Sequence, residues 1–69
     1  MAELTEKQSD IFEYIKRFVL ENQYPPSVRE IASGVGLKSS STVHKHLMNL
    51  KQKGYINWKQ DNTRTIVIV

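Results

Sequence analysis

The sequence contains no cysteine, only two prolines and three glycines, and no long apolar run. The absence of cysteine excludes disulfide bridges, thiolate nucleophiles and cysteine-ligated zinc. No apolar stretch approaches the roughly 20 residues of a membrane-spanning helix, and the acidic start at Ala2-Glu3 lacks the basic region of a signal peptide. The 69 residues therefore predict one small domain, residues 1–69, located in the cytoplasm and not bound to a membrane.

Acidic residues are scarce in the second half of the chain, where the positive charge is concentrated. Residues 1–30 hold four basic and six acidic side chains, a net charge of −2, whereas residues 31–69 hold six basic and one acidic, a net charge of +5. A basic half favours a polyanionic partner, nucleic acid first. Many lysine-rich domains bind no polyanion, so charge alone does not establish nucleic-acid binding, and the motifs are needed to test it.

The first periodic segment begins with a capping box. Thr5 and Gln8 have the spacing at which the hydroxyl accepts from the Gln8 amide while the Gln8 side chain reaches back. Apolar residues then recur at helical spacing, and the segment ends near Glu21-Asn22, before the two prolines. The face of this helix that we expect in the core consists of Ile11, Phe12, Ile15, Phe18 and Val19.

A short second helix and a tight turn follow. Ser27 and Glu30 form a second capping box, and Gly34 is expected to end the helix. In the turn over residues 34–36, Val35 is predicted to point inward, and Leu37 adds another apolar contact. The apolar side of this helix comprises Val28, Ile31 and Ala32.

The serine run at 39–41 supplies a third N-cap, without indicating which serine caps. The third helix is predicted over about residues 41–53, ended by Gly54, since residues placed at about 100° intervals put Val43, Leu47 and Leu50 in one narrow stripe. Ser41, Lys45, Met48 and Gln52 lie roughly opposite that stripe. One face of this helix is therefore core, and the other is polar.

The end of the chain changes from helical to strand periodicity. Residues 55–59 alternate, residues 65–69 are rich in β-branched side chains, and residues 60–64 have turn chemistry. Tyr55 and Trp58 are expected to pack rather than to stack on bases, since single-strand binders present several exposed aromatics. The element order predicts a mainly α fold with a small β-hairpin, a three-helix winged helix-turn-helix.

Two histidines lie two residues apart on the predicted third helix. His44 and His46 would point about 200° from each other, so they cannot hold one ion together. A serine nucleophile would need a base and an acid in a pocket, and this chain has little volume for one. We therefore expect no metal, no cofactor and no enzymatic activity. His46 is expected to pack at the core edge, and His44 to flank the exposed face.

The polar face of the third helix suits the major groove of duplex DNA. Small polar residues near the start of a helix allow close approach, and a longer donor then reaches base acceptors. Ser41, Thr42, His44 and Lys45 fit this description, although an ordinary N-cap and solvated face would look similar. Cations placed to contact phosphates, two of them flanking a hairpin tip that can lie along the minor groove, are Lys51, Lys53, Lys59 and Arg64.

Four segments have a distinctive combination of residues: Leu4-Thr5-x-x-Gln8, Tyr24-Pro25-Pro26-Ser27-Val28-Arg29-Glu30-Ile31, Val35-Gly36-Leu37 and Ser39-Ser40-Ser41-Thr42-Val43-His44. Together they resemble the amino-terminal DNA-binding domain of the LexA repressors. The register continues through His46-Leu47, Leu50 and Lys53-Gly54, so that the likeness runs through essentially all 69 residues. The form of the serine run is similar to that of LexA from low-GC Gram-positive bacteria.

This resemblance implies a bacterial, nucleoid-associated transcriptional repressor of the SOS response to DNA damage. It implies a palindromic operator with half-sites GAAC and its complement, and a second copy of the chain that pairs on the palindrome, weakly or not at all without DNA. The implied base-reading residues are Ser40, Ser41, Thr42, His44 and Lys45. The implied backbone contacts are Thr5, Lys7, Ser39, Lys53 and Arg64, to which the charge pattern adds Lys59.

Two features differ from the family pattern. The Ala-Gly cleavage site and the serine–lysine protease domain are absent from these residues, so self-cleavage and the main dimer interface are expected to reside elsewhere or to have been dispensed with. Lys45 and residues 59–63 also differ, and a lysine on this helix either favours guanine acceptors or adds phosphate affinity. The competing class is a winged helix for protein–protein contact, for which Met48 is the one exposed apolar candidate on the helix.

Overall fold

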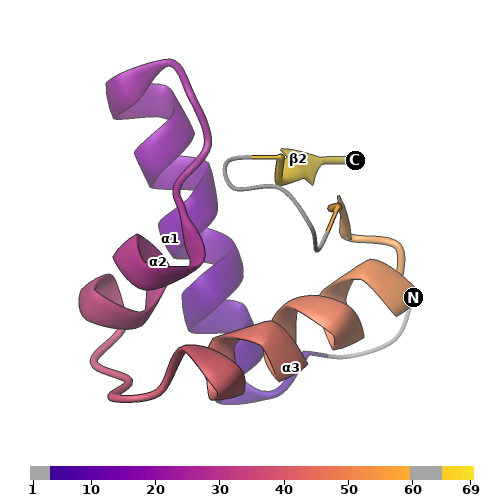
Figure 1. Ribbon diagram of the computed structural model, residues 1–69. Helices are drawn as coiled ribbons and strands as arrows, with labels where there is room; N and C mark the ends of the chain where they lie inside the picture. Colours follow the sequence, from indigo (N-terminus) through magenta and orange to yellow (C-terminus); the bar gives the residue numbers. More distant parts are fainter. Residues whose placement is uncertain (1–3, 60–64) are drawn as a thin grey trace.

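The structure is a computed structural model that describes residues 4–59 and 65–69. Within these residues, three helices precede a two-stranded antiparallel hairpin (Figure 1), which confirms the predicted winged helix-turn-helix. The register pairs Ile56 with Ile68 and Asn57 with Val67. The elements are α1 (Glu6–Asn22), α2 (Val28–Gly34), α3 (Ser40–Gln52), β1 (Ile56–Asn57) and β2 (Val67–Ile68).

Both predicted capping boxes are present. The Thr5 hydroxyl accepts from the Gln8 amide at 3.2 Å, and the Thr5 amide donates to Gln8 Oε1 at 3.1 Å. At α2, the Glu30 amide donates to the Ser27 hydroxyl at 3.2 Å, and the Ser27 amide donates to Glu30 Oε1 at 2.8 Å. Each box satisfies two donors at a helix start and so fixes where the helix begins.

The third helix begins one residue earlier than predicted, and its cap differs from the other two. Ser39 is the N-cap, but its side chain makes no capping hydrogen bond. Its backbone (φ −116°, ψ 126°) departs from that of Thr5 and Ser27, whose ψ is 165° in both cases. The prediction that the serine run supplies the N-cap of α3 is therefore confirmed for Ser39, although its hydroxyl does not make the usual capping hydrogen bond. The helix ends at Gln52, and Gly54 follows in the left-handed region at φ 85°, as a glycine there permits.

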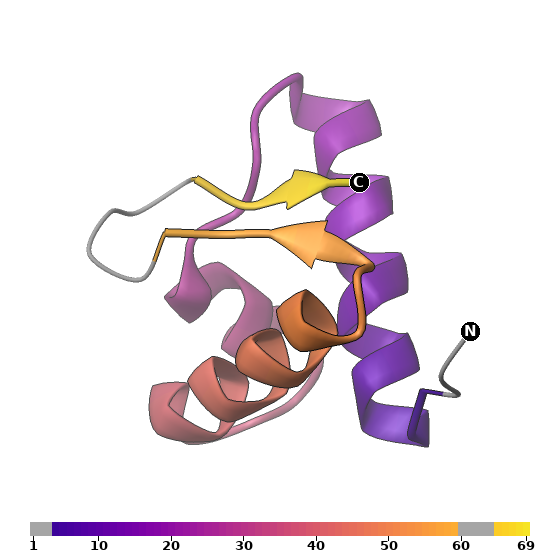
Figure 2. The ribbon, with the colours of Figure 1, turned by 90° about the vertical axis from the view of Figure 1, so that its right-hand side faces the viewer.

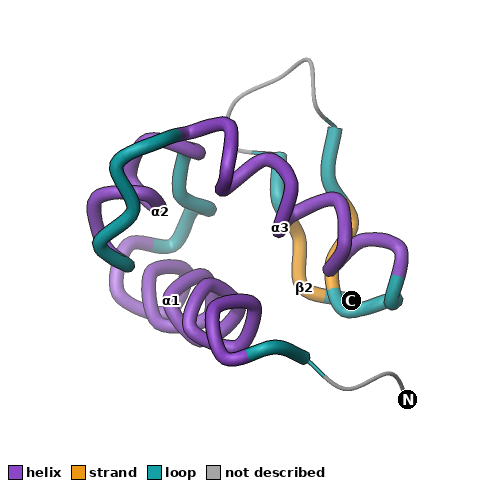
Figure 3. Tube along the Cα trace, turned by 90° about the horizontal axis from the view of Figure 1, so that it is seen from below, coloured by secondary structure: helices purple, strands orange, loops and turns teal. Residues whose placement is uncertain are grey.

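The helices and the hairpin enclose one hydrophobic cluster. Figure 3 shows α2 and α3 on the same side of α1, which is seen almost end-on, and Figure 2 shows the hairpin above α3 and beside α1. All three helices and the hairpin contribute to the cluster, which confirms the predicted core stripes of α2 and α3. Its buried members are Ile11, Ile15, Ile31, Ala32, Val43, Leu47, Leu50, Ile56, Trp58 and Ile66.

Partly buried side chains complete the packing. Phe12, Val19, Val35 and Leu37 all lie against the cluster, as expected. Phe18 is the exception: it is half-buried and lies outside the cluster. The upper end of α1 extends beyond α2 and α3 (Figure 1), and the Phe18 ring instead meets Tyr14 and Tyr24 at centroid distances of 6.0 and 5.5 Å.

The hairpin pairs over fewer residues than the strand pattern predicts. Beyond the two backbone pairs, the Thr65 hydroxyl makes the hydrogen bonds to the opposite strand. It accepts from the Lys59 amide at 3.1 Å and donates to the Lys59 carbonyl at 3.0 Å. The Thr65 side chain thus replaces the backbone pairing at Lys59–Thr65, two positions beyond the Asn57–Val67 pair. The predicted polar tip, residues 60–64 with Arg64, lies outside the described residues. Within those that are described, no helix has the length and apolar character needed to cross a membrane.

Candidate nucleic-acid interface

The two faces of α3 differ sharply in exposure. Val43, Leu47 and Leu50 are 0% exposed and anchor the helix to the core. The opposite face is exposed over its first two turns, and α3 runs along the lower edge of the molecule in Figure 1. A helix so anchored presents a fixed surface to a partner. The predicted DNA-contacting residues that are exposed on this face or at the start of the helix are Ser39, Ser40, Ser41, Thr42 and Lys45.

His44 is placed differently from the other four predicted base-reading residues. It is half-buried, and its ring stands edge-on to Trp58 with a centroid distance of 4.9 Å and an interplanar angle of 75°. Trp58 is only 2% exposed, and Tyr55 packs against the core with its ring edge-on to Phe12, so both aromatics pack as expected. His44 therefore joins α3 to the hairpin rather than projecting freely.

His46 lies half-buried on α3, as expected of a histidine at the core edge. Its Nδ1 is buried, and within the described part of the chain it has no hydrogen-bond partner. Among residues 4–59 and 65–69, no three histidine, aspartate or glutamate side chains are grouped so as to hold a metal ion.

Two predicted phosphate contacts already have partners inside the protein. Lys53 Nζ donates to Gln8 Oε1 at 2.9 Å, the same oxygen that receives the Thr5 amide. Lys7 Nζ donates to the Val35 carbonyl at 3.4 Å and lies 3.9 Å from an Asp10 carboxylate oxygen. These lysines tie the start of α1 to the end of α3 and to the turn after α2.

Gln8 has a role beyond its capping box that sequence patterns do not indicate. Gln8 is 4% exposed, and its contact with Lys53 spans 45 positions of the chain. Thr5, another predicted backbone contact, is exposed, but its hydroxyl already serves the cap. Capping boxes are local patterns, whereas a link between the two ends of a domain has no local signal.

The cations of the hairpin region are divided between an internal and an external role. Lys51 Nζ donates to the Trp58 carbonyl at 2.9 Å. Lys59 is exposed, and only its backbone contacts Thr65. Arg64 lies outside the described residues. Lys59 thus has an exposed side chain, whereas the Lys51 ammonium is engaged with Trp58.

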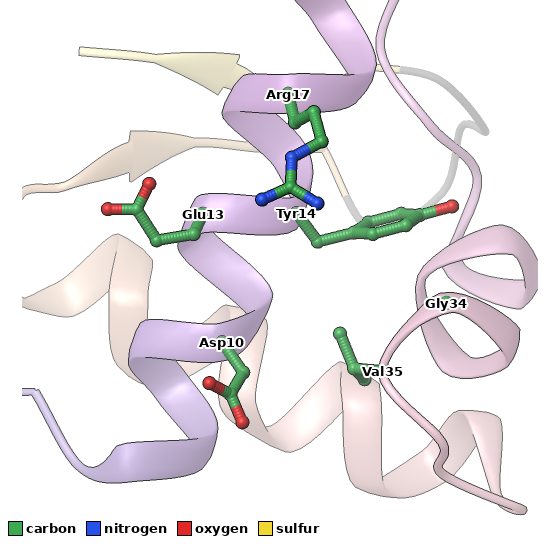
Figure 4. A pocket seen from close by; sticks show the side chains of 6 residues that line it. All are labelled: Asp10, Glu13, Tyr14, Arg17, Gly34 and Val35. Atoms are coloured by element: carbon green, nitrogen blue, oxygen red, sulfur yellow. The ribbon is translucent and has the colours of Figure 1, made fainter.

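A hollow of about 360 Å³ lies between α1 and the end of α2, lined by residues of α1, of α2 and of the turn after it (Figure 4). Burial, and then the charges of Glu30 and Glu21, raise the pKa of the Tyr14 hydroxyl at its wall above the ordinary value. Carboxylates at this surface disfavour a polyanion. The hollow is lined by Asp10, Glu13, Tyr14, Arg17, Gly34 and Val35.

The fold is a helix-turn-helix with a hairpin wing, and the exposed face of its α3 is rich in hydroxyl groups. This chain matches a known protein family. The LexA DNA binding domain family matches residues 1–65 of the 69. The chain belongs to this family. Membership confirms the resemblance that the motifs at residues 24–31 and 39–44 indicate.

Curated relatives of this LexA-family chain are repressors from staphylococci. The LexA repressor of Staphylococcus carnosus is 58% identical over all 69 residues, and those of Staphylococcus epidermidis and Staphylococcus aureus are each 56% identical over the same span. The chain covers 33% of the S. carnosus and S. aureus proteins and 34% of the S. epidermidis protein. It therefore spans about a third of the length of these relatives.

Proposed function

We propose that this chain binds a palindromic DNA operator and represses transcription of the genes behind it, as a LexA-type regulator of the bacterial response to DNA damage. Family membership supports DNA as the partner. The observation that carries the proposal is the exposed start of α3: Ser41 and Lys45 lie opposite a fully buried stripe, and the exposed Ser40 and Thr42 lie beside them in the first turn. Such a face can enter the major groove without disturbing the core.

The size and order of these side chains suit base reading. Short hydroxyl side chains at residues 40–42 let the helix approach the base edges closely, and each hydroxyl both donates and accepts. Lys45 stands four residues after Ser41, one turn further along the same face. Its ammonium reaches further than the hydroxyls and suits the paired acceptors of guanine.

Residues proposed to contact the phosphate backbone of the DNA surround this face. The Ser39 hydroxyl makes no capping hydrogen bond, so it and the first amides of α3 suit a phosphate oxygen. Lys59 is exposed on the wing. Thr5, Lys7, Lys53 and Arg64 are also proposed to contact the DNA backbone.

Pairing on DNA completes the proposed mode of action. Two copies related by the two-fold axis of a palindrome place one α3 in each half-site, proposed to read GAAC and its complement. The copies associate weakly or not at all without the operator. Covering the operator then blocks transcription, and a repressor acting in this way works on the bacterial nucleoid.

A fluorescence-anisotropy titration at two salt concentrations tests this proposal. One duplex carries a GAAC…GTTC palindrome, and the other carries the same bases in scrambled order. We expect a preference of about 10³-fold or more for the palindrome that persists at the higher salt, although both affinities fall. Equal binding that disappears with salt, or no binding to either duplex, would contradict it.

Single substitutions separate the two kinds of contact. Thr42→Ala and Lys45→Ala should alter the ratio between the duplexes. Lys59→Ala should weaken both alike and reduce the slope of log affinity against log salt by about 1. Lys16→Gln, on α1 beside Glu13 at 3.7 Å, removes one charge elsewhere and serves as the control. Lys53→Ala is a poorer probe because its ammonium also holds Gln8.

A further inference from the structure

Trp58, the residue that leads into the wing, is held from α3 at two points. Its indole ring meets the His44 ring edge-on at a centroid distance of 4.9 Å. Its carbonyl accepts from Lys51 Nζ at 2.9 Å, and its amide donates to Asn57 Oδ1 at 3.0 Å. Ring, carbonyl and amide of this one residue are all engaged, although the chain has already left β1.

The two contacts on α3 lie seven residues apart, and hence on one face. Seven residues advance a helix by about 700°, which leaves His44 and Lys51 about 20° apart around the axis and roughly 10 Å apart along it. The core contacts of Ile56 and Ile66 hold the base of the hairpin on the helices. The two contacts of Trp58, separated along the axis of α3, add a constraint on the angle between the hairpin and the helix.

The base of the wing transmits that angle to its exposed end. The Thr65 hydroxyl bridges the Lys59 amide and carbonyl at 3.1 and 3.0 Å, one residue beyond Trp58. Ile66, 2% exposed, anchors the returning strand in the core. Trp58 and Lys59 therefore move together with the strand opposite them.

We propose that His44 and Lys51 are positioning residues that set the angle between α3 and the wing, so that the α3 face and Lys59 contact one duplex together. The proposal rests on the proposed DNA-binding function. It assigns Lys51 a role through the Trp58 carbonyl rather than on a phosphate, and His44 a role through its ring rather than on a base. Both residues thereby influence operator affinity without touching DNA.

Lys51→Met tests the first assignment, because it keeps the apolar stem and removes the donor. It is compared in the wild-type background and in a Lys59→Ala/Arg64→Ala background that lacks the wing cations. We expect about a three- to tenfold loss of operator affinity in the first background and less than a twofold change in the second, since coupled residues are not additive. Lys51→Arg, which keeps donors, should restore wild-type affinity.

An equal loss in both backgrounds would overturn this assignment, because a lysine that contacts a phosphate directly acts without the wing. In that case the salt slope of the wing-neutral protein would also fall by about 1 with Lys51→Met. Urea unfolding of each variant shows that the compared proteins are folded.

His44→Phe and His44→Ala test the second assignment. Phenylalanine keeps the edge-on aromatic contact but has no polar atom for a base. We expect His44→Phe to retain the preference for the palindrome and His44→Ala to lose much of the affinity. If both variants lose the preference equally, His44 reads a base and the assignment is wrong.

The contacts of His44 and Lys51 with Trp58, called the clamp below, are also tested without DNA. The probe is the fluorescence of Trp58, the only tryptophan of the chain. In the free protein, His44→Ala and Lys51→Met should shift its emission to the red and increase quenching by acrylamide, whereas Lys59→Ala should not. Unchanged emission in both would overturn the clamp even if operator binding is established. If the wild-type protein shows no operator preference, the proposed function fails, and the emission still reports on the clamp.

Discussion

Gly34 closes α2 directly against the ring of Tyr14, and replacing it with alanine tests how tightly α2 is seated on α1 (Figure 4). A Cβ atom at Gly34 would overlap three ring atoms of Tyr14. Overpacking of this kind costs about 1–3 kcal/mol. Alanine offsets part of this cost through its higher helix propensity, worth at most about 1 kcal/mol and less at the last residue of a helix. We therefore expect Gly34→Ala to lower the unfolding free energy by about 1 kcal/mol.

Thermal and urea unfolding followed by circular dichroism measure this change. A loss of about 1 kcal/mol corresponds to a fall in Tm of about 4–8 °C for a domain of this size. In a Tyr14→Ala background the ring is gone, so the same substitution should be neutral or stabilising. The reasoning is refuted if Gly34→Ala raises Tm, or if it costs the same with and without the Tyr14 ring.

Three further changes test the packing and the electrostatics. Gln8→Ala removes half of the α1 capping box and the acceptor of Lys53, and should lower the unfolding free energy by about 1–3 kcal/mol in urea titrations, with exposed Glu13→Ala as a control. Leu47→Ala, at a position that is 0% exposed, should cost about 2–5 kcal/mol in the same assay. The raised pKa of Tyr14 means that the native state holds this proton more tightly than the unfolded state does, so stability is lost as pH rises above the ordinary value of 10.0. Tyr14→Phe should accordingly show a shallower decline above that pH, and an identical decline would contradict the assignment.

Local patterns predicted most of the fold. The capping boxes at Thr5 and Ser27 and the end of α1 depend on residues within one or two turns, and the structure confirms them. The buried stripe of α3 follows from helical periodicity alone. Local patterns did not predict the position of Phe18 or the lengths of the strands, because both depend on contacts with other elements. Phe18 lies outside the core cluster, at the end of α1 that extends beyond α2 and α3. At Thr65, a threonine side chain replaces backbone pairing with Lys59.

The candidate site, too, was predicted where it depends on local periodicity and not where it depends on contacts between elements. The exposure of Ser41 and Lys45 follows from their place opposite the core stripe, and that of Thr42 from its place beside them, both of which the sequence shows. The sequence does not reveal the internal hydrogen bonds of Lys51 and Lys53, because their acceptors lie seven and 45 positions away, outside α3. A cation count therefore identifies a basic half, and only the structure separates cations that hold the fold from the exposed Lys59.

The most direct test of the account is an NMR titration of the ¹⁵N-labelled chain with the palindromic duplex, following each backbone amide. We predict the largest shifts at residues 39–45, with further shifts at the start of α1 and at Lys59, and little change around the hollow lined by Asp10, Glu13 and Arg17. The scrambled duplex should produce smaller shifts that disappear with salt. Shifts that centre on that hollow, or that leave residues 39–45 unchanged, would contradict the claim that the exposed face of α3 reads the operator.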